Sequence, residues 1–312
     1  MMQDYKLMLD AYAQAGGTPD IFKNSQIAHL VIHKNKVFGS NVVNGLVLKP
    51  RETESGVDIK LMVKKDIKIK NPVHLCFGVL PKVGIQEINF RAKIEEGAGV
   101  KVLAHCVFPN AVKVVHKMNA EIEIADSAYY EYDEVHFHGQ IGGIEVIPRA
   151  KIKVGKNSRI ITNFWLLKGR VGFLNLDYES EILDNSILEM TVKIYGYGDD
   201  RIKIREVGIL IGRSSRGLIK SRIAVKNNAQ SEIINELIAT APDTRGHVDC
   251  VEIIQDNAQA KAIPIVNVTN ELAKVTHEAA IGRVDKKQVQ TLMAKGLDEE
   301  ESIDLLVSGM LK

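Results

Sequence analysis

The sequence has few aromatic side chains and almost no net charge. Aromatic residues make up 5% of the 312-residue chain and include one tryptophan, so we expect a mostly aliphatic core with few stacking platforms for bases or sugars. Lys and Arg number 41 against 39 Asp and Glu, a formal net charge of +2. A broad nucleic-acid-binding surface needs a clear basic excess. We therefore expect no nucleic-acid partner.

Cysteines and long hydrophobic runs are also scarce. The three cysteines, Cys76, Cys106 and Cys250, are too few for a disulfide framework and indicate individual thiols in a reducing compartment. No segment approaches the roughly 20 apolar residues of a membrane span. Asp4 and Asp10 stand where a signal peptide would be apolar. We expect a cytoplasmic protein that does not associate with membranes.

A helical period is confined to the two ends of the chain. Near the C-terminus, Asp285 and Asp298 occupy N-cap positions, with Gln288 and Glu301 three residues further on, which predicts two helices separated by Gly296. Near the N-terminus, one short helix is predicted to end at a Gly-Gly pair. Its apolar stripe is formed by Tyr5, Met8, Leu9 and Tyr12.

The long stretch between these helices alternates between apolar and polar residues. Segments such as KVVHKMNAEIEIA and DRIKIREVGILI are typical of β-strands, and Gly, Asn, Asp or Ser separates them. Turn signals recur from Gly99 to Ala273 in twelve steps of about 14–15 residues. We interpret each step as one coil, with two strands and two turns, of a β-solenoid. An antiparallel meander is the rival interpretation.

Three local motifs have an ordinary explanation beside a functional one. The segment 212–217 has the glycine spacing of a phosphate loop, but Leu218 replaces the required lysine, so we interpret it as a turn. Glu134, His136 and His138 share one strand face, which suits a metal or acid–base chemistry, although a solvated polar face is the favoured interpretation. Cys76 shares a face with a nearby histidine, and we expect a buried structural thiol.

A further group of ligand-type residues lies where the strand pattern ends. Cys250 has Asp249 beside it, and His277 and Glu278 follow after a gap that we interpret as nearly two coils. Sulfur, imidazole and carboxylate ligands together suit iron. A surface cysteine and a histidine at the start of a helix explain the same residues equally well.

Two stretches resemble a known family. The end of the chain, THEAAIGRVDKKQVQTLMAKGLDEEESIDLLVSGMLK, is similar to the C-terminus of the SufB/SufD proteins of iron–sulfur cluster assembly. The segment GAGVKVLAHCVFP resembles the SufB strand that ends in a cysteine shortly before a proline. The resemblance covers about residues 85–312 and implies an all-β solenoid, a right-handed parallel β-helix with a short N-terminal helix and a C-terminal helical pair.

The resemblance also implies a function and partners. It implies a non-enzymatic scaffold that carries a transient iron–sulfur cluster and works with a SufC-like ABC ATPase. The ATPase would dock on the C-terminal helices, where we expect Leu292, Met293 and Leu306 to form part of its seat. Cys106 matches the cysteine at which sulfur enters SufB, supplied by a cysteine desulfurase or by sulfide, before it passes inside the β-helix toward a second cysteine.

The cluster ligands and the oligomeric state follow from the same resemblance. The family implicates the His-Glu pair, here His277 and Glu278, and we expect Cys250 and Glu278 to be ligands, with His277 next. An ungapped count places the distal SufB cysteine on Asp249, so Asp249 is the alternative. We expect a homodimer joined through the last β-strands, about residues 245–280, whose edges are unpaired.

The expected organisation has three parts: an N-terminal helical segment (1–22), a β-helix core (23–280) and a C-terminal helical segment for ATPase docking (281–312). Two alternative functions remain. A cluster-free, SufD-like structural partner fits the same fold, although the His-Glu-Ala motif favours SufB. A β-helix carbohydrate-active enzyme would need a secretion signal and more aromatic residues.

Overall fold

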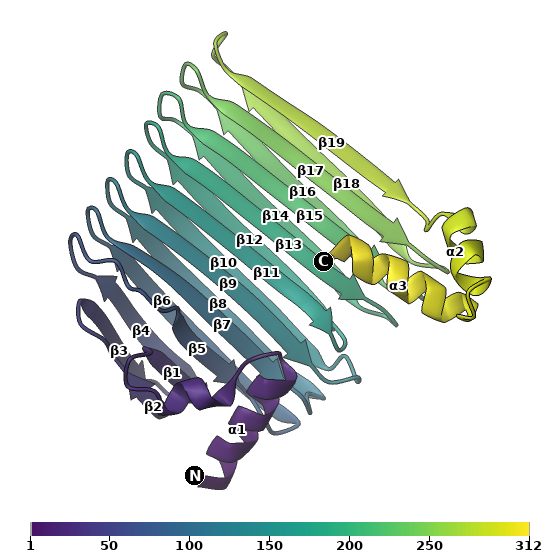
Figure 1. The fold of residues 1–312 in the computed structure, drawn as a ribbon, viewed down its shortest axis with the longest axis horizontal. Coiled ribbons are helices and arrows are strands. Elements are labelled where there is room, and N and C mark those ends of the chain that lie inside the picture. The colour runs from purple at the N-terminus through teal and green to yellow at the C-terminus, as the bar shows by residue number, and fades with distance from the viewer. Residues whose placement is uncertain (1, 312) are drawn as a thin grey trace.

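The chain is a two-sheet parallel β-solenoid with one helix at its N-terminal end and two at its C-terminal end (Figure 1). A computed structural model describes residues 2–311. All neighbouring strands are parallel except the β1–β2 and β3–β4 pairs at the N-terminal end. The solenoid and its helical ends confirm the predicted fold class.

The two sheets divide the strands between them. Sheet A runs in the order β19 (Lys274–Gly282), β17 (Arg245–Ile254), β15 (Arg216–Val225), β13 (Ile187–Gly196), β11 (Arg159–Lys168), β9 (Tyr129–His138), β7 (Gly99–Phe108), β5 (Val73–Gly78), β1 (His29–His33) and β2 (Lys36–Asn41). Sheet B runs in the order β18 (Gln259–Val268), β16 (Gln230–Ala239), β14 (Arg201–Leu210), β12 (Phe173–Ile182), β10 (Ile144–Val154), β8 (Lys113–Ile124), β6 (Val83–Ile94), β4 (Gly56–Val63) and β3 (Leu46–Glu52).

The length of one coil differs from the prediction. Within sheet A, Ile160 pairs with Leu188 and Leu188 pairs with Gly217, so one coil is about twice as long as the predicted step. That step is therefore one strand and one turn, not a whole coil. From β4 onward, consecutive strands alternate between the two sheets, which a pattern of strands and turns does not reveal.

One type of turn recurs between the strands. Asn157, Asn185 and Asp256 each adopt a left-handed backbone conformation, with φ of +55°. Asn and Asp tolerate this conformation better than other side chains, because their short polar groups bond to the local backbone. The DNS, NNAQ and DNAQ segments of the sequence each contain one such residue and are variants of one turn.

The core lies between the inner faces of the two sheets. Strand β8 shows the pattern, because every second residue from Val114 to Ile124 is buried and those between are partly or fully exposed. The inward residues are mainly Val, Ile and Leu, whose branched side chains pack well on a pleated surface. No helix interrupts this core, so side chains from successive coils stack directly along the solenoid axis.

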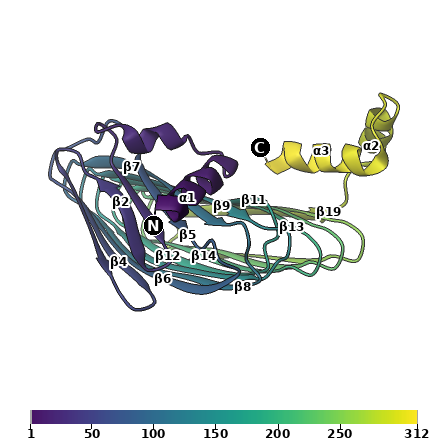
Figure 2. The same ribbon diagram turned by 90° about the horizontal axis from the view of Figure 1, so that it is seen from below.

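Helix α1 (Met2–Gln14) and the 3₁₀ helix η1 (Pro19–Lys23) cover the outer face of sheet A at its N-terminal end (Figure 2). Met8 and Tyr12 pack there against Val31 and Cys76, and all four side chains are buried. The Tyr12 hydroxyl lies 3.1 Å from Nδ1 of His74. Cys76 is therefore a buried thiol of this helix–sheet interface, as expected.

The two C-terminal helices begin at the predicted caps. The Asp285 side chain accepts hydrogen bonds from the first turn of α2 (Lys286–Met293), and Asp298 and Glu301 form a capping box at α3 (Glu299–Leu311). Helix α3 lies on the outer face of sheet A, on the same side as α1 (Figure 2). Its Val307 and Leu311 pack against Ala224 of β15.

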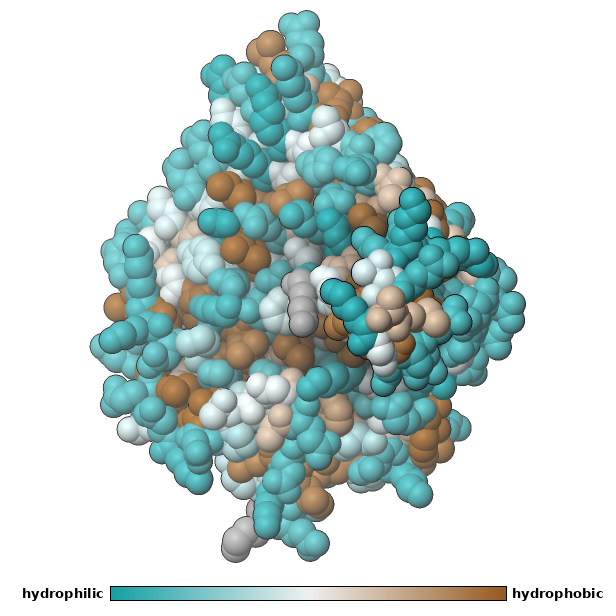
Figure 3. Space-filling view, turned by 45° about the vertical axis from the view of Figure 1, so that its right-hand side comes forward, coloured by the Kyte–Doolittle hydropathy of each residue, from teal (hydrophilic) through white to brown (hydrophobic). Residues whose placement is uncertain are grey.

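The face shown in Figure 3 is mostly hydrophilic, with hydrophobic residues in small groups. The C-terminal end of the solenoid is open, because β18 and β19 each have a paired neighbour on one side of their sheet only. Val268 and Ile281 are among the hydrophobic residues exposed there. No helix within residues 2–311 has the length and apolar character needed to cross a lipid bilayer.

Candidate functional site

Cys106 lies inside the solenoid, in a group of buried polar side chains. Its Sγ is 3.8 Å from Oε1 of Glu134, and that oxygen is 2.7 Å from Nε2 of His136. The His136 ring continues the chain, with Nδ1 3.1 Å from Nε2 of His138. The His116 ring lies beside His136, at 6.1 Å between centroids. We call these five residues the Cys106 cluster.

The burial of this cluster overturns the interpretation of a solvated polar strand face. Glu134, His136 and His138 are each at most 2% exposed and face the interior. Only the alternate residues of β9 face outward, where Glu131 and Asp133 form ion pairs with Lys101. Sequence alternation shows which residues of a strand share a face, but it does not show which face points into the protein. The interior position of this polar face could therefore not be predicted from the sequence.

Burial shifts the pKa of every ionisable group in the cluster toward its neutral form. Desolvation raises the pKa of the Cys106 thiol well above 9.0, and the nearby Glu134 adds to the effect. Desolvation also raises the pKa of the Glu134 carboxyl and lowers that of His136 to about 3. The resting cluster is therefore an uncharged network, and Cys106 needs a base or a cation before it acts as a thiolate.

A second buried polar group surrounds Cys250 in β17. Nδ2 of Asn235 donates to Cys250 Sγ at 3.4 Å and to Ser221 Oγ at 2.5 Å. On the same strand, Glu252 Oε2 accepts a hydrogen bond of 2.6 Å from Ser231. Burial raises the pKa of Cys250 to about 11. Both Cys106 and Cys250 are therefore internal thiols, on strands β7 and β17 of sheet A.

A line of polar side chains joins the two cysteines. From the Cys106 cluster, Glu134 Oε2 accepts a hydrogen bond of 3.4 Å from Tyr178 of β12. Tyr178 is the ladder neighbour of Glu206 in β14, and Glu206 is the ladder neighbour of Asn235 in β16, which contacts Cys250. The inward residues of β13 in sheet A are all apolar. Between the two cysteines, the polar side chains of the line therefore lie on sheet B. Strands 4.8 Å apart place the two cysteines about 24 Å apart along the axis.

Several oxygens along this line lack a hydrogen-bond partner within residues 2–311. Native proteins pair nearly all buried polar atoms, so unpaired ones in one place call for a physical explanation such as an internal water or a passing ligand. Burial raises the pKa of Glu206 to about 8, which shows how unfavourable its charge is there. The unpaired atoms are Ser180 Oγ, Glu206 Oε2, Asn235 Oδ1 and Glu252 Oε1.

The predicted ligands at the C-terminal end lie on two opposite faces. Strand β19 pairs directly with β17, so Cys250 and His277 are one coil apart and on adjacent strands, not nearly two coils apart. His277 is paired with Val248 and therefore shares the interior face of Cys250. Glu278 is paired with Asp249 on the outer face. The structure thus brings together Cys250 with His277, and Asp249 with Glu278, but not Cys250 with Glu278.

Asp249 is already engaged in an ion pair. Both its carboxylate oxygens accept hydrogen bonds from the Arg222 guanidinium, at 3.0 and 2.5 Å. This arrangement holds the pKa of Asp249 below its ordinary value. A metal at Asp249 would have to displace a bidentate arginine, whereas the His277 and Glu278 side chains are exposed on the last strand.

The predicted ATPase seat is only partly exposed. Met293 is 43% exposed at the end of α2, whereas Leu292 and Leu306 are half-buried. Val307 and Leu311 of α3 are covered by sheet A. Leu305, which the sequence did not single out, is 49% exposed on α3.

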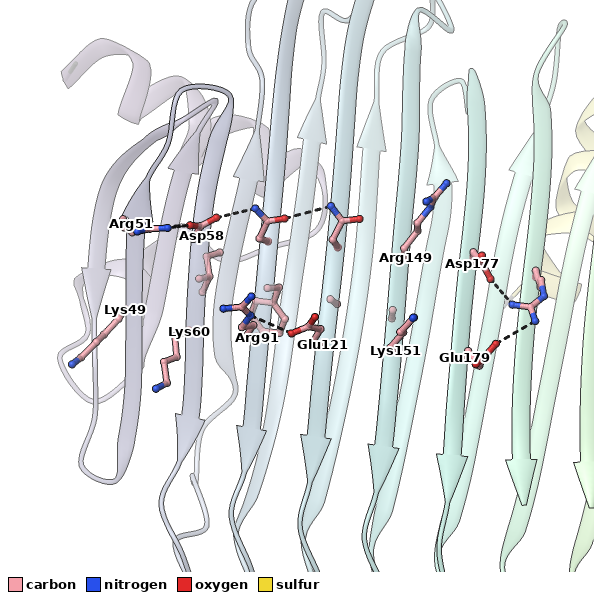
Figure 4. Close-up of a pocket in the computed structure, with 17 residues that line it drawn as sticks. Lys49, Arg51, Asp58, Lys60, Arg91, Glu121, Arg149, Lys151, Asp177 and Glu179 are labelled. Atoms are coloured by element: carbon pink, nitrogen blue, oxygen red, sulfur yellow. Dashed lines mark hydrogen bonds and ion pairs between the residues drawn. The ribbon is translucent and has the colours of Figure 1, made fainter. Parts of the chain in front are cut away.

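A charged groove of about 810 Å³ lies on the outer face of sheet B (Figure 4). Arg91 pairs with Glu121, and Arg205 pairs with Asp177, across neighbouring strands. None of the predicted site residues lines this groove, so it is separate from the interior line. Among the residues that the structure describes, its basic side chains without an ion-pair partner are Lys49, Lys60, Arg149 and Lys151.

Comparisons with known proteins identify a family model and relatives that are similar to this chain. Residues 87–310 match the model of the SUF system FeS cluster assembly SufBD core domain. The chain is 35% identical to an iron–sulfur cluster assembly SufBD family protein of Methanocaldococcus jannaschii, over 97% of this chain and 96% of that protein. It is 33% identical to a SufBD family protein of Pyrococcus horikoshii, over 99% and 94% of the two chains. The chain therefore belongs to the SufBD family of iron–sulfur cluster assembly proteins.

Proposed function

We propose that this chain is a scaffold on which iron–sulfur clusters are assembled as cargo, and that it works in the cytoplasm with a SufC-like ABC ATPase. The observation that carries the proposal is the buried polar line from Cys106 to Cys250. Most of the interior is aliphatic, whereas this line keeps, within residues 2–311, four unpaired oxygens between two thiols. A purely structural role gives no reason for such a path.

Sulfur enters at Cys106 in this proposal. A desulfurase persulfide would pass its terminal sulfur to the Cys106 sulfur and recover its own thiol, so the oxidation level of the transferred sulfur is unchanged. The Cys106 proton would pass to the Glu134 carboxyl as that carboxyl gives its own proton to Nε2 of His136, so that a thiolate and an imidazolium form. Because Cys106 is fully buried, the turns at this end of the strands must open to admit the donor.

The cluster forms at the other end of the line. Cys250 supplies the thiolate, and His277 is its neighbour on the interior face of the next strand. Glu278 and Asp249 lie on the outer face, so they reach the same cluster only where two chains share it. A homodimer through the free edges of β18 and β19 would bring two such sites together.

The experiment is anaerobic reconstitution of the full chain with iron and sulfide, followed by iron analysis and by the absorption of bound cluster. Cys250→Ala is expected to lose most bound iron. Cys76→Ala is the matched control, because Cys76 is equally buried but lies under α1. Unchanged iron and sulfide in both Cys250→Ala and Asp249→Ala would refute the proposal.

Two further variants identify the ligand set. A cluster held within one chain predicts that His277→Ala loses iron and Glu278→Ala retains it, because only His277 shares the face of Cys250. Loss in Glu278→Ala indicates a cluster shared between chains. Loss in Asp249→Ala with full retention in Cys250→Ala would show that the ungapped family register is right.

A further inference from the structure

We propose that the Cys106 cluster is a binding site for one divalent first-row transition-metal ion, held by the Cys106 sulfur, a Glu134 oxygen and the His136 Nε2. These three ligand atoms all lie within 4.8 Å of one another, and all three residues are buried. Bonds of about 2.0–2.3 Å place the ligands of one such ion roughly 3.5 Å apart, so small side-chain shifts admit it. A sulfur, nitrogen and oxygen donor set suits ions such as Zn²⁺, Fe²⁺ or Co²⁺ rather than Mg²⁺ or Ca²⁺.

The surrounding hydrogen bonds orient His136 for this role. Nδ1 of His138 lies 2.9 Å from the carbonyl oxygen of Arg170, which only accepts, so this nitrogen carries the proton. In a neutral ring, Nε2 of His138 then accepts from Nδ1–H of His136, which leaves the lone pair of His136 Nε2 directed at Glu134. Metal-bound histidines are typically fixed in this way through their second nitrogen.

A fourth donor is present beside the three. The His116 side chain is 1% exposed, and neither ring nitrogen has a hydrogen-bond partner within the described residues. Its ring lies against His136 and Phe108, with centroids 6.1 and 5.0 Å away. An unpaired buried imidazole is unfavourable by itself, and coordination of an ion next to it would satisfy one nitrogen.

The charge balance favours a divalent ion. The short contact between Glu134 Oε1 and the unprotonated His136 Nε2 requires a proton on the carboxyl, and the buried thiol carries another. Binding replaces these two protons with one M²⁺ ion, which gives a thiolate and a carboxylate as ligands and leaves the net charge of the interior unchanged. No uncompensated charge is buried, which is the usual obstacle to an internal ion.

The inference concerns the Cys106 cluster, which the proposed function also uses for sulfur entry, but it does not rest on that function, because the donor atoms are present whatever the chain assembles. The two experiments are separable because cluster assembly is measured at Cys250 and ion binding at the Cys106 cluster. A Cys250→Ser chain removes the thiol of the proposed assembly site and leaves the Cys106 cluster intact.

The test uses Co²⁺ as the probe in the full-length Cys250→Ser chain. The ion is added anaerobically to purified protein and, separately, supplied in the growth medium so that the chain can fold around it. We expect one Co²⁺ per chain with a thiolate-to-cobalt charge-transfer band. Cys106→Ser is expected to lose the band, His136→Gln to lose most bound Co²⁺, and Cys76→Ser to keep both.

A positioning variant tests the orientation of His136. We expect His138→Gln to retain the fold and the band but to bind Co²⁺ about 10–100-fold more weakly. Circular dichroism shows whether each variant is folded. Absence of Co²⁺ from folded Cys250→Ser protein under both loading conditions overturns the proposal, as does binding that survives Cys106→Ser unchanged.

Discussion

Glu206 offers the sharpest test of the interior polar line. It lies in β14 between Tyr178 and Asn235, it is 1% exposed, and its Oε2 has no partner within the described residues. Burial raises its pKa from 4.5 to about 8. Replacing this side chain by glutamine removes the ionisation and keeps the shape, so Glu206→Gln is expected to stabilise the protein at neutral pH.

The magnitude follows from the pKa shift. Between pH 4.5 and 8 the folded carboxyl keeps a proton that the unfolded chain has lost, so stability falls as the pH rises through this window. Each pH unit in the window is worth about 1.4 kcal/mol. Glu206→Gln should therefore raise the free energy of unfolding by about 3 kcal/mol at pH 7 and about 4 kcal/mol at pH 8, with little change below pH 4.5.

The assay is chemical denaturation of both proteins at pH 5, 7 and 8, followed by circular dichroism. A stability difference that does not grow with pH refutes the reasoning, because it would show that Glu206 is not held neutral by burial. The same variant is expected to slow the appearance of cluster at Cys250 when sulfur comes from a desulfurase. A variant that is more stable but assembles its cluster more slowly would indicate that the carboxyl serves function and not the fold.

Three other predictions test the surfaces and a buried histidine. Met293→Glu should abolish co-purification with the ATPase, whereas Leu183→Glu, an exposed hydrophobic residue on the solenoid, should not; persistence in Met293→Glu would place the seat elsewhere. Val268→Lys at the open end should turn a dimer into a monomer in sedimentation experiments, and a wild-type monomer at micromolar concentration would remove the basis for the dimer. Lowering the pH from 7 to 5 should reduce the free energy of unfolding of the wild-type protein by about 2 kcal/mol more than that of His116→Gln. The reason is that unfolded His116 binds a proton below pH 6.5, whereas the folded residue binds one only near pH 3. Equal losses in the two proteins, measured by denaturation, would contradict this prediction.

Much of the candidate site was visible in the sequence, but its grouping was not. Glu134, His136 and His138 share a face by simple alternation, and Cys106 is the ladder neighbour of His136 on the adjacent strand. A coil of twice the assumed length would have placed these two residues side by side. The shorter assumed coil hid this neighbour, and it also placed His277 too far from Cys250.

Strand register also determines which of the predicted C-terminal ligands lie on the same face of the sheet. The sequence shows that Asp249 and Cys250 must face opposite sides of a strand, because side chains alternate. Only the pairing of β17 with β19 shows that Cys250 faces inward with His277 while Asp249 faces outward with Glu278. The prediction that Cys250 and Glu278 bind the same cluster did not take this register into account.

The sequence by itself determined the local structure, because strands, turns and helix caps depend on neighbouring residues. Alternating Val and Ile specify the strands, Asn and Asp specify the left-handed turns, and Asp285 and Asp298 begin the last helices. The tertiary structure alone decided that consecutive strands from β4 onward belong to opposite sheets, that the histidine-bearing face of β9 is the inner one, and that sheet A covers part of the apolar face of α3. These outcomes depend on contacts between residues one or more coils apart, and no local pattern of side chains specifies which of two faces the stacked coils will enclose.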